Sequence, residues 1–315
     1  MKLLALLLAA LCLTELHALS SNETDHHGHT YFHGGADWDG LCKVGKQQSP
    51  IDIPVSLFSK PSSLKTDARL HGKDIEEQLE LSPDLDFVGS YGDFENAQIT
   101  THEGATIKVE VEDGTIVFID YDDHMRIFSA HELHFHSPSE HTFNNGEKHF
   151  DMEMHLVHYD KHGIYGEKNK TYTVLSVFFD VEDGGNTTNP FIESLNLQDA
   201  DLSELDYRGI TKDVDLNTMI SNLDKEKGLF HYKGSLTTPP CTESTDWIIS
   251  FDVQPISAEQ LQLFQREWAH RLEFAGGRGN NREVQAINDR KIYMHKEETD
   301  ALDLFFTLSM FLVFA

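Results

Sequence analysis

The chain has 315 residues, and its 53 acidic residues outnumber its 25 lysines and arginines, which gives a formal net charge of −28 at pH 7. Negative charge on this scale repels nucleic acid and anionic membrane surfaces, so we expect neither as a partner. The length, once terminal segments are set aside, suits one large domain whose core can bury a central sheet.

The N-terminus has the pattern of a secretory signal. Met1-Lys2 supplies one positive charge, residues 3–13 are apolar, and residues 18–21 offer a cleavage site. We therefore assign residues 1–20 to a signal peptide and residues 21–36 to a histidine-rich N-terminal segment. The protein is expected to be secreted or displayed at the cell surface.

The secretory route makes two kinds of modification relevant. Of the three cysteines, Cys12 lies in the signal, which leaves Cys42 and Cys241 as an even pair for one disulfide. Acceptor triplets of the form Asn-x-Thr, candidates for N-glycosylation, begin at Asn22, Asn169 and Asn186.

Strand patterns dominate the middle of the chain. Alternating apolar and polar residues predict strands at 106–111, 132–136, 152–158 and 247–253. Residues 172–179 form a nearly continuous apolar run, as expected for a central strand covered on both faces. The clearest helix is predicted at 257–268, with Ser257 as its N-cap and Gln260 three residues later.

The C-terminal residues 304–315 are apolar but number only about half of the ~20 residues that a membrane-spanning helix requires. Two interpretations stay open. The segment could be the removable tail of a lipid-anchor signal, with short side chains at 299–301 upstream, or a packed or partner-binding tail. We separate a tail at 296–315 from a domain at 37–295.

Three histidines give the strongest functional signal. Residues i and i+2 of a strand share a face, so His134 and His136 can hold one metal ion. The pair Asn145-Gly146 predicts a hairpin turn that returns the strand of His155 beside the first. Zinc bound by three neutral histidines keeps its fourth position open for water, which is typical of catalytic sites.

Chance offers a competing interpretation. With 19 histidines in the chain, roughly one His-x-His is expected at random, and a second one, His27-Gly28-His29, does occur. On this reading, residues 132–136 are a strand with two satisfied polar groups. The motifs that accompany the histidines weigh against it.

Three further motifs stand at fixed order and spacing around the histidines: Gln-Gln-Ser-Pro-Ile-Asp-Ile at 47–53, Ser-Pro-Ser-Glu-His-Thr at 137–142, and Gly-Ser-Leu-Thr-Thr-Pro-Pro-Cys-Thr-Glu at 234–243. Together they resemble the alpha-class carbonic anhydrases of the secreted type, from about Trp38 to Arg290. The resemblance implies a mixed α/β, mostly β fold: a large central twisted, mainly antiparallel sheet with short surrounding helices. It also implies that 37–295 is the catalytic domain and that Cys42 pairs with Cys241.

The implied activity is the zinc-dependent, reversible hydration of carbon dioxide to bicarbonate and a proton by attack of zinc hydroxide. By resemblance, Thr237 accepts the hydrogen bond of the hydroxide and donates its own hydroxyl proton in a hydrogen bond to Glu140. Carbon dioxide carries no charge, so its pocket should be an apolar wall. The matching substrate-binding positions are Val157, Val174, Leu236 and Trp247, with Thr237 and Thr238 beside the product bicarbonate.

Further residues match positions that orient the metal-bound imidazoles. Glu153 should hold the ring of His155, and His141 and Asn280 are supporting residues. Residue 132 is often glutamine in the family and is Glu132 here. We expect this carboxylate to make the site more anionic.

Proton release departs from the family pattern. Fast members relay the proton through a histidine, and the matching position in this chain is Ala105. His102 is the candidate replacement, and the histidines of the N-terminal segment are a second choice. We therefore expect moderate turnover that external buffer accelerates.

A second class of function is a non-catalytic, carbonic-anhydrase-like extracellular binding or matrix module. Such domains typically lack one or more of the zinc histidines, whereas this chain keeps all three together with Thr237 and Glu140. Another zinc hydrolase is disfavoured because no His-Glu-x-x-His signature is present.

Overall fold

The structure is a computed structural model that describes residues 29–54, 79–81, 85–92, 97–102, 106–111, 113–120, 122–144, 146, 148–168, 170–199, 208–269 and 272–295. The predicted signal peptide, the tail at 296–315, Asn22, Asn169 and Ala105 lie outside these residues. Within them, no helix has both the length and the apolar character needed to cross a bilayer.

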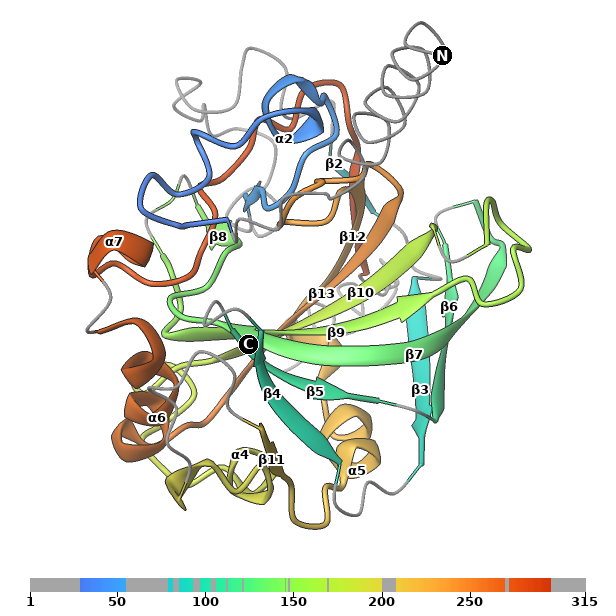
Figure 1. Ribbon diagram of the computed structural model, residues 1–315. Coiled ribbons are helices and arrows are strands. Elements are labelled where there is room, and N and C mark those ends of the chain that lie inside the picture. The colour runs from blue at the N-terminus through green and yellow to red at the C-terminus, as the bar shows by residue number, and fades with distance from the viewer. Residues whose placement is uncertain are drawn as a thin grey trace, which may run out of the picture.

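One large curled sheet forms the centre of the molecule (Figure 1). Its main path runs β11 (Arg208–Ile210), β4 (Gln98–His102), β5 (Thr106–Glu110), β7 (Met125–His136), β9 (Met152–Tyr159), β10 (Tyr172–Phe179), β13 (Thr245–Gln254), β12 (Leu229–Gly234), β14 (Ile292–His295) and β2 (Leu79–Leu81). Beside this path, β6 (Gly114–Ile119) pairs with β7 and with β3 (Asp86–Tyr91). In the large sheet only β10–β13 and β14–β2 are parallel.

Short elements surround the sheet, as expected. They are α2 (Leu41–Val44), α4 (Pro190–Ser194), η2 (Leu197–Asp199), α5 (Leu216–Ser221), η3 (Lys225–Lys227), α6 (Ala258–Ala269), α7 (Leu272–Ala275) and a small parallel pair of β1 (Asp52–Ile53) with β8 (Thr142–Phe143). The predicted fold class, mostly β with a mainly antiparallel central sheet, is confirmed.

The predicted elements are found close to their expected positions. Strand β10 coincides with 172–179, and its side chains are buried on both faces. Helix α6 begins directly after Ser257, whose hydroxyl accepts the N–H of Gln260, while the Gln260 side chain accepts the N–H of Ser257. This reciprocal pair satisfies two donors that the first turn of a helix leaves open.

The two faces of the sheet carry separate hydrophobic clusters. Leu133, Phe135 and Leu156 belong to the larger cluster, and Val157 and Trp247 belong to the second. Because side chains alternate along a strand, the histidines at 134, 136 and 155 point to the face of the second cluster.

A β-bulge sets this orientation in β7. The register against β9 shifts between Ala130 and Glu132. Before the shift Phe128 and Ala130 face the larger cluster, and after it Leu133 and Phe135 do. One extra residue changes the positions that face the larger cluster from even-numbered to odd-numbered residues. The bulge therefore places the even-numbered residues at the end of β7, among them the two histidines, on the opposite face.

The predicted pairing of the two histidine strands is confirmed, but the predicted turn between them is wrong. Strands β7 and β9 are antiparallel neighbours, but the segment 137–151 joins them. Within that segment, Phe143 and Lys148 form an isolated bridge around the Asn-Gly pair, of which Asn145 lies outside the described residues. The turn therefore lies within the connection between β7 and β9 and does not join these two strands directly. The motif at 137–142 comes before it in the chain.

The disulfide expected between Cys42 and Cys241 is present. It joins α2 to the loop that follows β12, across 199 residues of sequence. The peptide bonds at Ser49-Pro50, Ser137-Pro138 and Pro239-Pro240 are cis. All three lie in the motifs that flank the histidines.

Candidate metal centre

The three histidines meet at the centre of the sheet. His134 on β7 is the direct register partner of His155 on β9, and His136 lies two residues further along β7. Their ring centroids are 5.2 Å apart for His134–His136 and His134–His155, and 4.6 Å apart for His136–His155. One ligand nitrogen from each ring lies within 4.8 Å of the others, so the three imidazoles could bind one ion.

Hydrogen bonds decide which nitrogens remain for the ion. His136 Nδ1 lies 2.7 Å from the carbonyl oxygen of Asn280, and His155 Nε2 lies 2.8 Å from Glu153 Oε1. Asn280 also accepts the Ser137 N–H and donates to the Phe135 carbonyl, so it holds the end of β7 on both sides. His136 Nε2 and His155 Nδ1 thus turn toward the shared centre.

The donor chemistry fits a metal ion. His136 is 1 % exposed, and its Nε2 has no hydrogen-bond partner among the described residues. Burial, together with the nearby His155 and His134, holds the pKa of His136 well below its usual range. Burial lowers the pKa of His155 to about 4, although Glu153 acts in the opposite direction. Metal ligation requires such neutral imidazoles.

Glu153 is hydrogen-bonded to several groups around the three histidines. Its Oε2 accepts the N–H groups of Glu140 and His141 at 2.7 and 2.9 Å, and its Oε1 lies 2.7 Å from His141 Nδ1 and 2.6 Å from Ser176 Oγ. Burial alone would raise the pKa of this carboxyl, but His141 and His155 hold it well below its usual range. Glu153 therefore stays ionised, which fixes the ring of His155.

Glu140 lies beside His136 and His155, and Thr237 contributes to its electrostatic environment. Glu140 is fully buried, its Oε1 accepts the Arg282 N–H at 2.8 Å, and the same oxygen lies 3.5 Å from His136 Nδ1. Burial raises the pKa of Glu140 to about 8, and the Thr237 side chain and the Arg282 N–H oppose this shift. Thr237 is 5 % exposed, so the pair is shielded from bulk water.

The loop that carries Thr237 is tied at several points. The Leu236 N–H donates to Thr242, and the Cys241 N–H donates to Thr238. The Cys241 carbonyl accepts from Gln48 Nε2 at 3.0 Å, and its sulfur is bonded to Cys42. These contacts hold the loop that carries Thr237 against the N-terminal segment.

The sequence indicated Glu132 but not its partner. Glu132 Oε1 lies 3.3 Å from His134 Nδ1, and Lys108 forms an ion pair with Glu132. Burial would raise the pKa of Glu132, but His134 and Lys108 lower it well below its usual range. Lys108 is the register partner of His134, so both side chains lie on the same face. The alternation of residues in β5 could have indicated which face of the strand Lys108 lies on. It could not have indicated that Lys108 lies opposite His134, because the register of β5 against β7 cannot be read from the sequence.

The expected apolar wall is assembled in part from one row across three strands. Val174 on β10 pairs with Val157 on β9 and with Trp247 on β13, and all three are buried. The Trp247 ring lies 4.8 Å from the ring of His155. The remaining substrate-binding candidates, Leu236 and Thr238, are half-buried on the Thr237 loop.

His102 is not brought into a defined role. It is the last residue of β4, opposite Thr106 on β5. Its side chain is not described, and Ala105 lies outside the described residues. Asn186, the one described glycosylation candidate, is exposed, and its side-chain oxygen accepts the Ala258 N–H at the start of α6.

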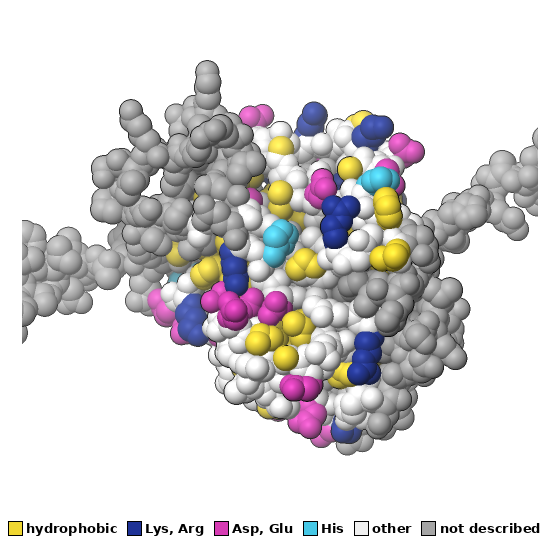
Figure 2. All heavy atoms as spheres, turned by 90° about the vertical axis from the view of Figure 1, so that its left-hand side faces the viewer, with side chains coloured by type: hydrophobic (Ala, Val, Ile, Leu, Met, Phe, Trp, Pro, Cys, Tyr) yellow, Lys and Arg dark blue, Asp and Glu magenta, His cyan; other side chains and the backbone are white. Residues whose placement is uncertain are grey.

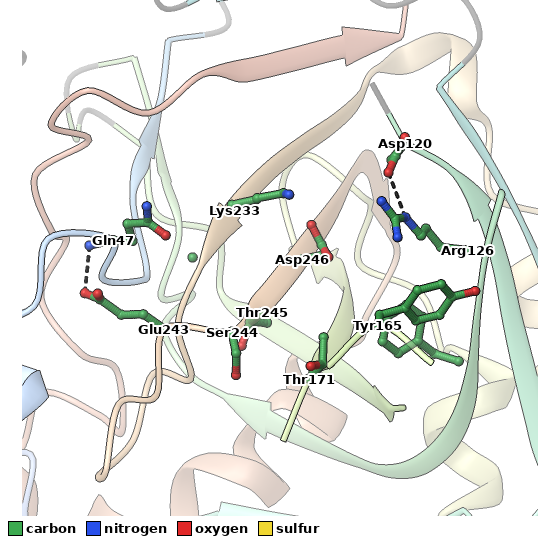
Figure 3. Close-up of a pocket in the computed structure, with 12 residues that line it drawn as sticks. Gln47, Asp120, Arg126, Tyr165, Thr171, Lys233, Glu243, Ser244, Thr245 and Asp246 are labelled. Carbon is green, nitrogen blue, oxygen red and sulfur yellow. Dashed lines mark hydrogen bonds and ion pairs between the residues drawn. The ribbon is translucent and has the colours of Figure 1, made fainter. Parts of the chain in front are cut away.

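A cavity of about 300 Å³ is lined by residues other than the three histidines (Figure 3). Lys233 and Asp246 line it and are register partners, so they lie on the face opposite the neighbouring pair Tyr232 and Trp247. Two of its charged groups pair with each other, since Arg126 Nε lies 2.8 Å from Asp120 Oδ2.

The molecular surface gives no sign of a polyanion site on the face shown in Figure 2. Lysine and arginine side chains lie among aspartates and glutamates there, without a patch of one sign.

Comparison with known proteins identifies the family. The profile of the eukaryotic-type carbonic anhydrases matches residues 33–296. The chain is 31 % identical to alpha carbonic anhydrase 8 of Arabidopsis thaliana over 88 % of its own length and 60 % of that protein, and 31 % identical to carbonic anhydrase Nec1 of Nesocodon mauritianus over 82 % and 78 %. The chain thus spans less than two thirds of the first of these relatives.

Solved structures agree. The alpha carbonic anhydrase of Thermovibrio ammonificans, solved with the inhibitor sulfanilamide, is 32 % identical with a TM-score of 0.57, covering 80 % of this chain and 89 % of that one. Carbonic anhydrase Cah3 of Chlamydomonas reinhardtii, solved with acetazolamide, is 25 % identical with a TM-score of 0.61, covering 84 % and 96 %.

Replacing Glu153 tests the described geometry. Glu153→Gln exchanges a buried acceptor for a group that must donate, so the ring of His155 loses its orientation. We expect zinc affinity to fall about 10- to 100-fold, measured by competition with a chromophoric chelator. Asp252→Asn is the matched control, since Asp252 is also a buried carboxylate that accepts a backbone N–H, that of Asp224. Zinc affinity of the Glu153 variant within threefold of the parent would contradict the account.

Proposed function

This chain belongs to the eukaryotic-type carbonic anhydrase family, and from that premise we propose a zinc-dependent mechanism for its hydration of carbon dioxide. The protein is an enzyme, a carbonic anhydrase. The observation that carries the proposal is the set of three imidazoles whose ligand nitrogens lie within 4.8 Å of one another, with the buried His136 Nε2 unpartnered among the described residues.

We assign the metal to zinc, held by His134, His136 and His155. Bound there, zinc would lower the pKa of a coordinated water molecule to about 7, which would supply a nucleophile at neutral pH. The protein contributes the orientation of the ligands. The Asn280 carbonyl and Glu153 fix two of the imidazoles, and Glu132 lies beside the third.

Thr237 and Glu140 are proposed to orient the attacking oxygen. The Arg282 N–H keeps one oxygen of Glu140 in place. When the Thr237 hydroxyl donates a hydrogen bond to Glu140, the oxygen of this hydroxyl is left to accept a hydrogen bond from the attacking water. This hydrogen bond would fix the orientation of the water. The backbone N–H of Thr237 is proposed to face the charge that develops on the carbon dioxide oxygen.

Carbon dioxide is proposed to bind against Val157, Val174 and Trp247, with Leu236 closing the wall. The valine and leucine side chains have no hydrogen-bonding group, and the Trp247 N–H is already donated to the Ser235 carbonyl. Val157, Val174 and Trp247 are buried. Thr238 is proposed to lie beside the bicarbonate product. No observation supports the alternative of a non-catalytic binding or matrix module.

We propose an extracellular location, supported by the Cys42–Cys241 disulfide. Residues 1–20 as signal peptide, 21–36 as N-terminal segment and 37–295 as catalytic domain remain our proposed organisation. Glycosylation is proposed at Asn22, Asn169 and Asn186, of which Asn186 is exposed in the structure.

The role of Thr237 can be measured directly. Thr237→Ala removes the hydroxyl that links Glu140 to the attacking oxygen, so we expect kcat/KM for carbon dioxide hydration to fall about 100-fold. Thr237→Ser keeps the hydroxyl and should restore most of the activity. Stopped-flow hydration assays at matched zinc content give the comparison. An alanine variant that stays folded and zinc-loaded with activity within twofold of the parent would refute the role.

The charge pair of Lys108 and Glu132 should tune the pH dependence. A negative charge near the metal disfavours ionisation of the attacking water, and a positive charge favours it. Glu132→Gln should therefore move the midpoint of the rate–pH profile to lower pH, and Lys108→Met should move it to higher pH, each by up to about one unit. The double variant should lie near the parent. If neither single substitution moves the midpoint, the pair does not tune the centre.

Proton release should respond to buffer. Because Ala105 replaces the relaying histidine of fast relatives, turnover is expected to rise with the concentration of an imidazole buffer. Ala105→His should raise turnover at low buffer, and His102→Ala should lower it if His102 is the relay. Unchanged turnover of the His102 variant at low buffer would clear this residue of the role.

A further inference from the structure

Exposed apolar side chains gather on the solvent face of β3, β6 and β7. Four of them are Val88, Ile119, Met125 and Ile127, which are 63, 38, 64 and 44 % exposed. Val88 pairs with Val117, Val117 pairs with Ile127, and Ile119 pairs with Met125, so the side chains form one continuous group. We call these five residues the outer patch. A sheet face of this kind, apolar and unshielded, marks a surface that another segment covers.

The edge of this part of the sheet is closed to a further strand. Both backbone groups of Tyr91 on β3 are bonded to the Asn217 side chain of α5. The Lys225 ammonium donates to the Phe87 carbonyl and pairs with Asp86. A charged side chain at an edge strand prevents strand addition. Whatever covers the outer patch must therefore lie across its face.

The end of the described chain is linked to the outer patch by a series of contacts. His295, the last residue of β14, lies 3.7 Å from Glu226 of η3, measured from Nε2 to Oε1. The neighbouring Lys225 pairs with Asp86 at the start of β3. Asp86 is in turn the register partner of Ile119, which belongs to the patch. A short path of contacts thus leads from the end of β14 to the patch.

The sequence that follows has the length and composition to reach it. Residues 296–303 are a polar connection of eight residues, which can extend up to about 26 Å. The three strands of the patch span only about 10 Å across. Residues 304–315 are apolar and contain no charged side chain.

We propose that residues 304–315 dock across the outer patch of their own chain. A second copy is the less favourable occupant, because two chains with a formal charge of −28 each repel one another, whereas the segment 304–315 brings no charge. Docking buries apolar surface on both sides, and the connection 296–303 keeps the segment at high local concentration.

Hydrogen exchange followed by mass spectrometry tests this on the full chain secreted from a eukaryotic host. We expect amides in 86–91 and 114–129 to exchange at least tenfold more slowly in the full chain than in a chain that lacks 304–315. Met125→Asp should abolish that protection in the full chain and change nothing further in the shortened one. Met125→Gln provides a milder substitution if the aspartate variant does not fold.

Leu272→Asp is the matched control. Leu272 is also 64 % exposed, and it lies on α7, on the opposite side of the sheet from β3 and β6 in Figure 1. This variant should keep the protection of the full chain.

Three results would overturn the proposal. The first is equal exchange in the full and shortened chains. The second is an intact mass showing that the secreted protein has lost the segment in exchange for a lipid. The third is a dimer, seen by light scattering of the shortened chain, that Met125→Asp dissociates.

Discussion

The ionised carboxylate of Glu153, buried beneath the three histidines, is the interaction on which the rest of the centre depends. An unpaired charge at this depth would be strongly destabilising, so its partners must all be in place when the chain folds. They come from the segment after β7, from His155 on β9 and from Ser176 on β10. Satisfying one buried charge therefore fixes the ring of His155, the backbone at Glu140 and the packing of three strands together.

Segments that are distant in the sequence pack together around Glu153 and its partners. The buried guanidinium of Arg282 donates to Gln48, to the Ser49 carbonyl and to the Cys42 carbonyl, while its own backbone N–H holds Glu140. The disulfide fastens the Thr237 loop to the same N-terminal segment. The groups that we propose to face the reacting atoms thus owe their positions to packing and covalent constraint, which suits a reaction whose substrate has no charge by which to be held.

Much of the fold and of the metal centre could be predicted from the sequence, because the residues concerned lie close together within single strands. Alternation in a strand put His134 and His136 on one face, and the run at 172–179 marked a strand buried on both sides. The bulge between Ala130 and Glu132 and the pairing of Lys108 with Glu132 could not be foreseen, since both depend on inter-strand register. The Asn145-Gly146 turn was assigned to the wrong pair of segments for the same reason.

The most direct test of the account is carbon dioxide hydration by the metal-free full chain during stepwise addition of zinc. The account predicts negligible activity without metal, a linear rise that ends at one zinc per chain, and no rise for a folded His136→Asn variant. A folded protein that binds one zinc per chain at the three histidines and still does not hydrate carbon dioxide would contradict it, and would favour a binding module on a carbonic anhydrase fold.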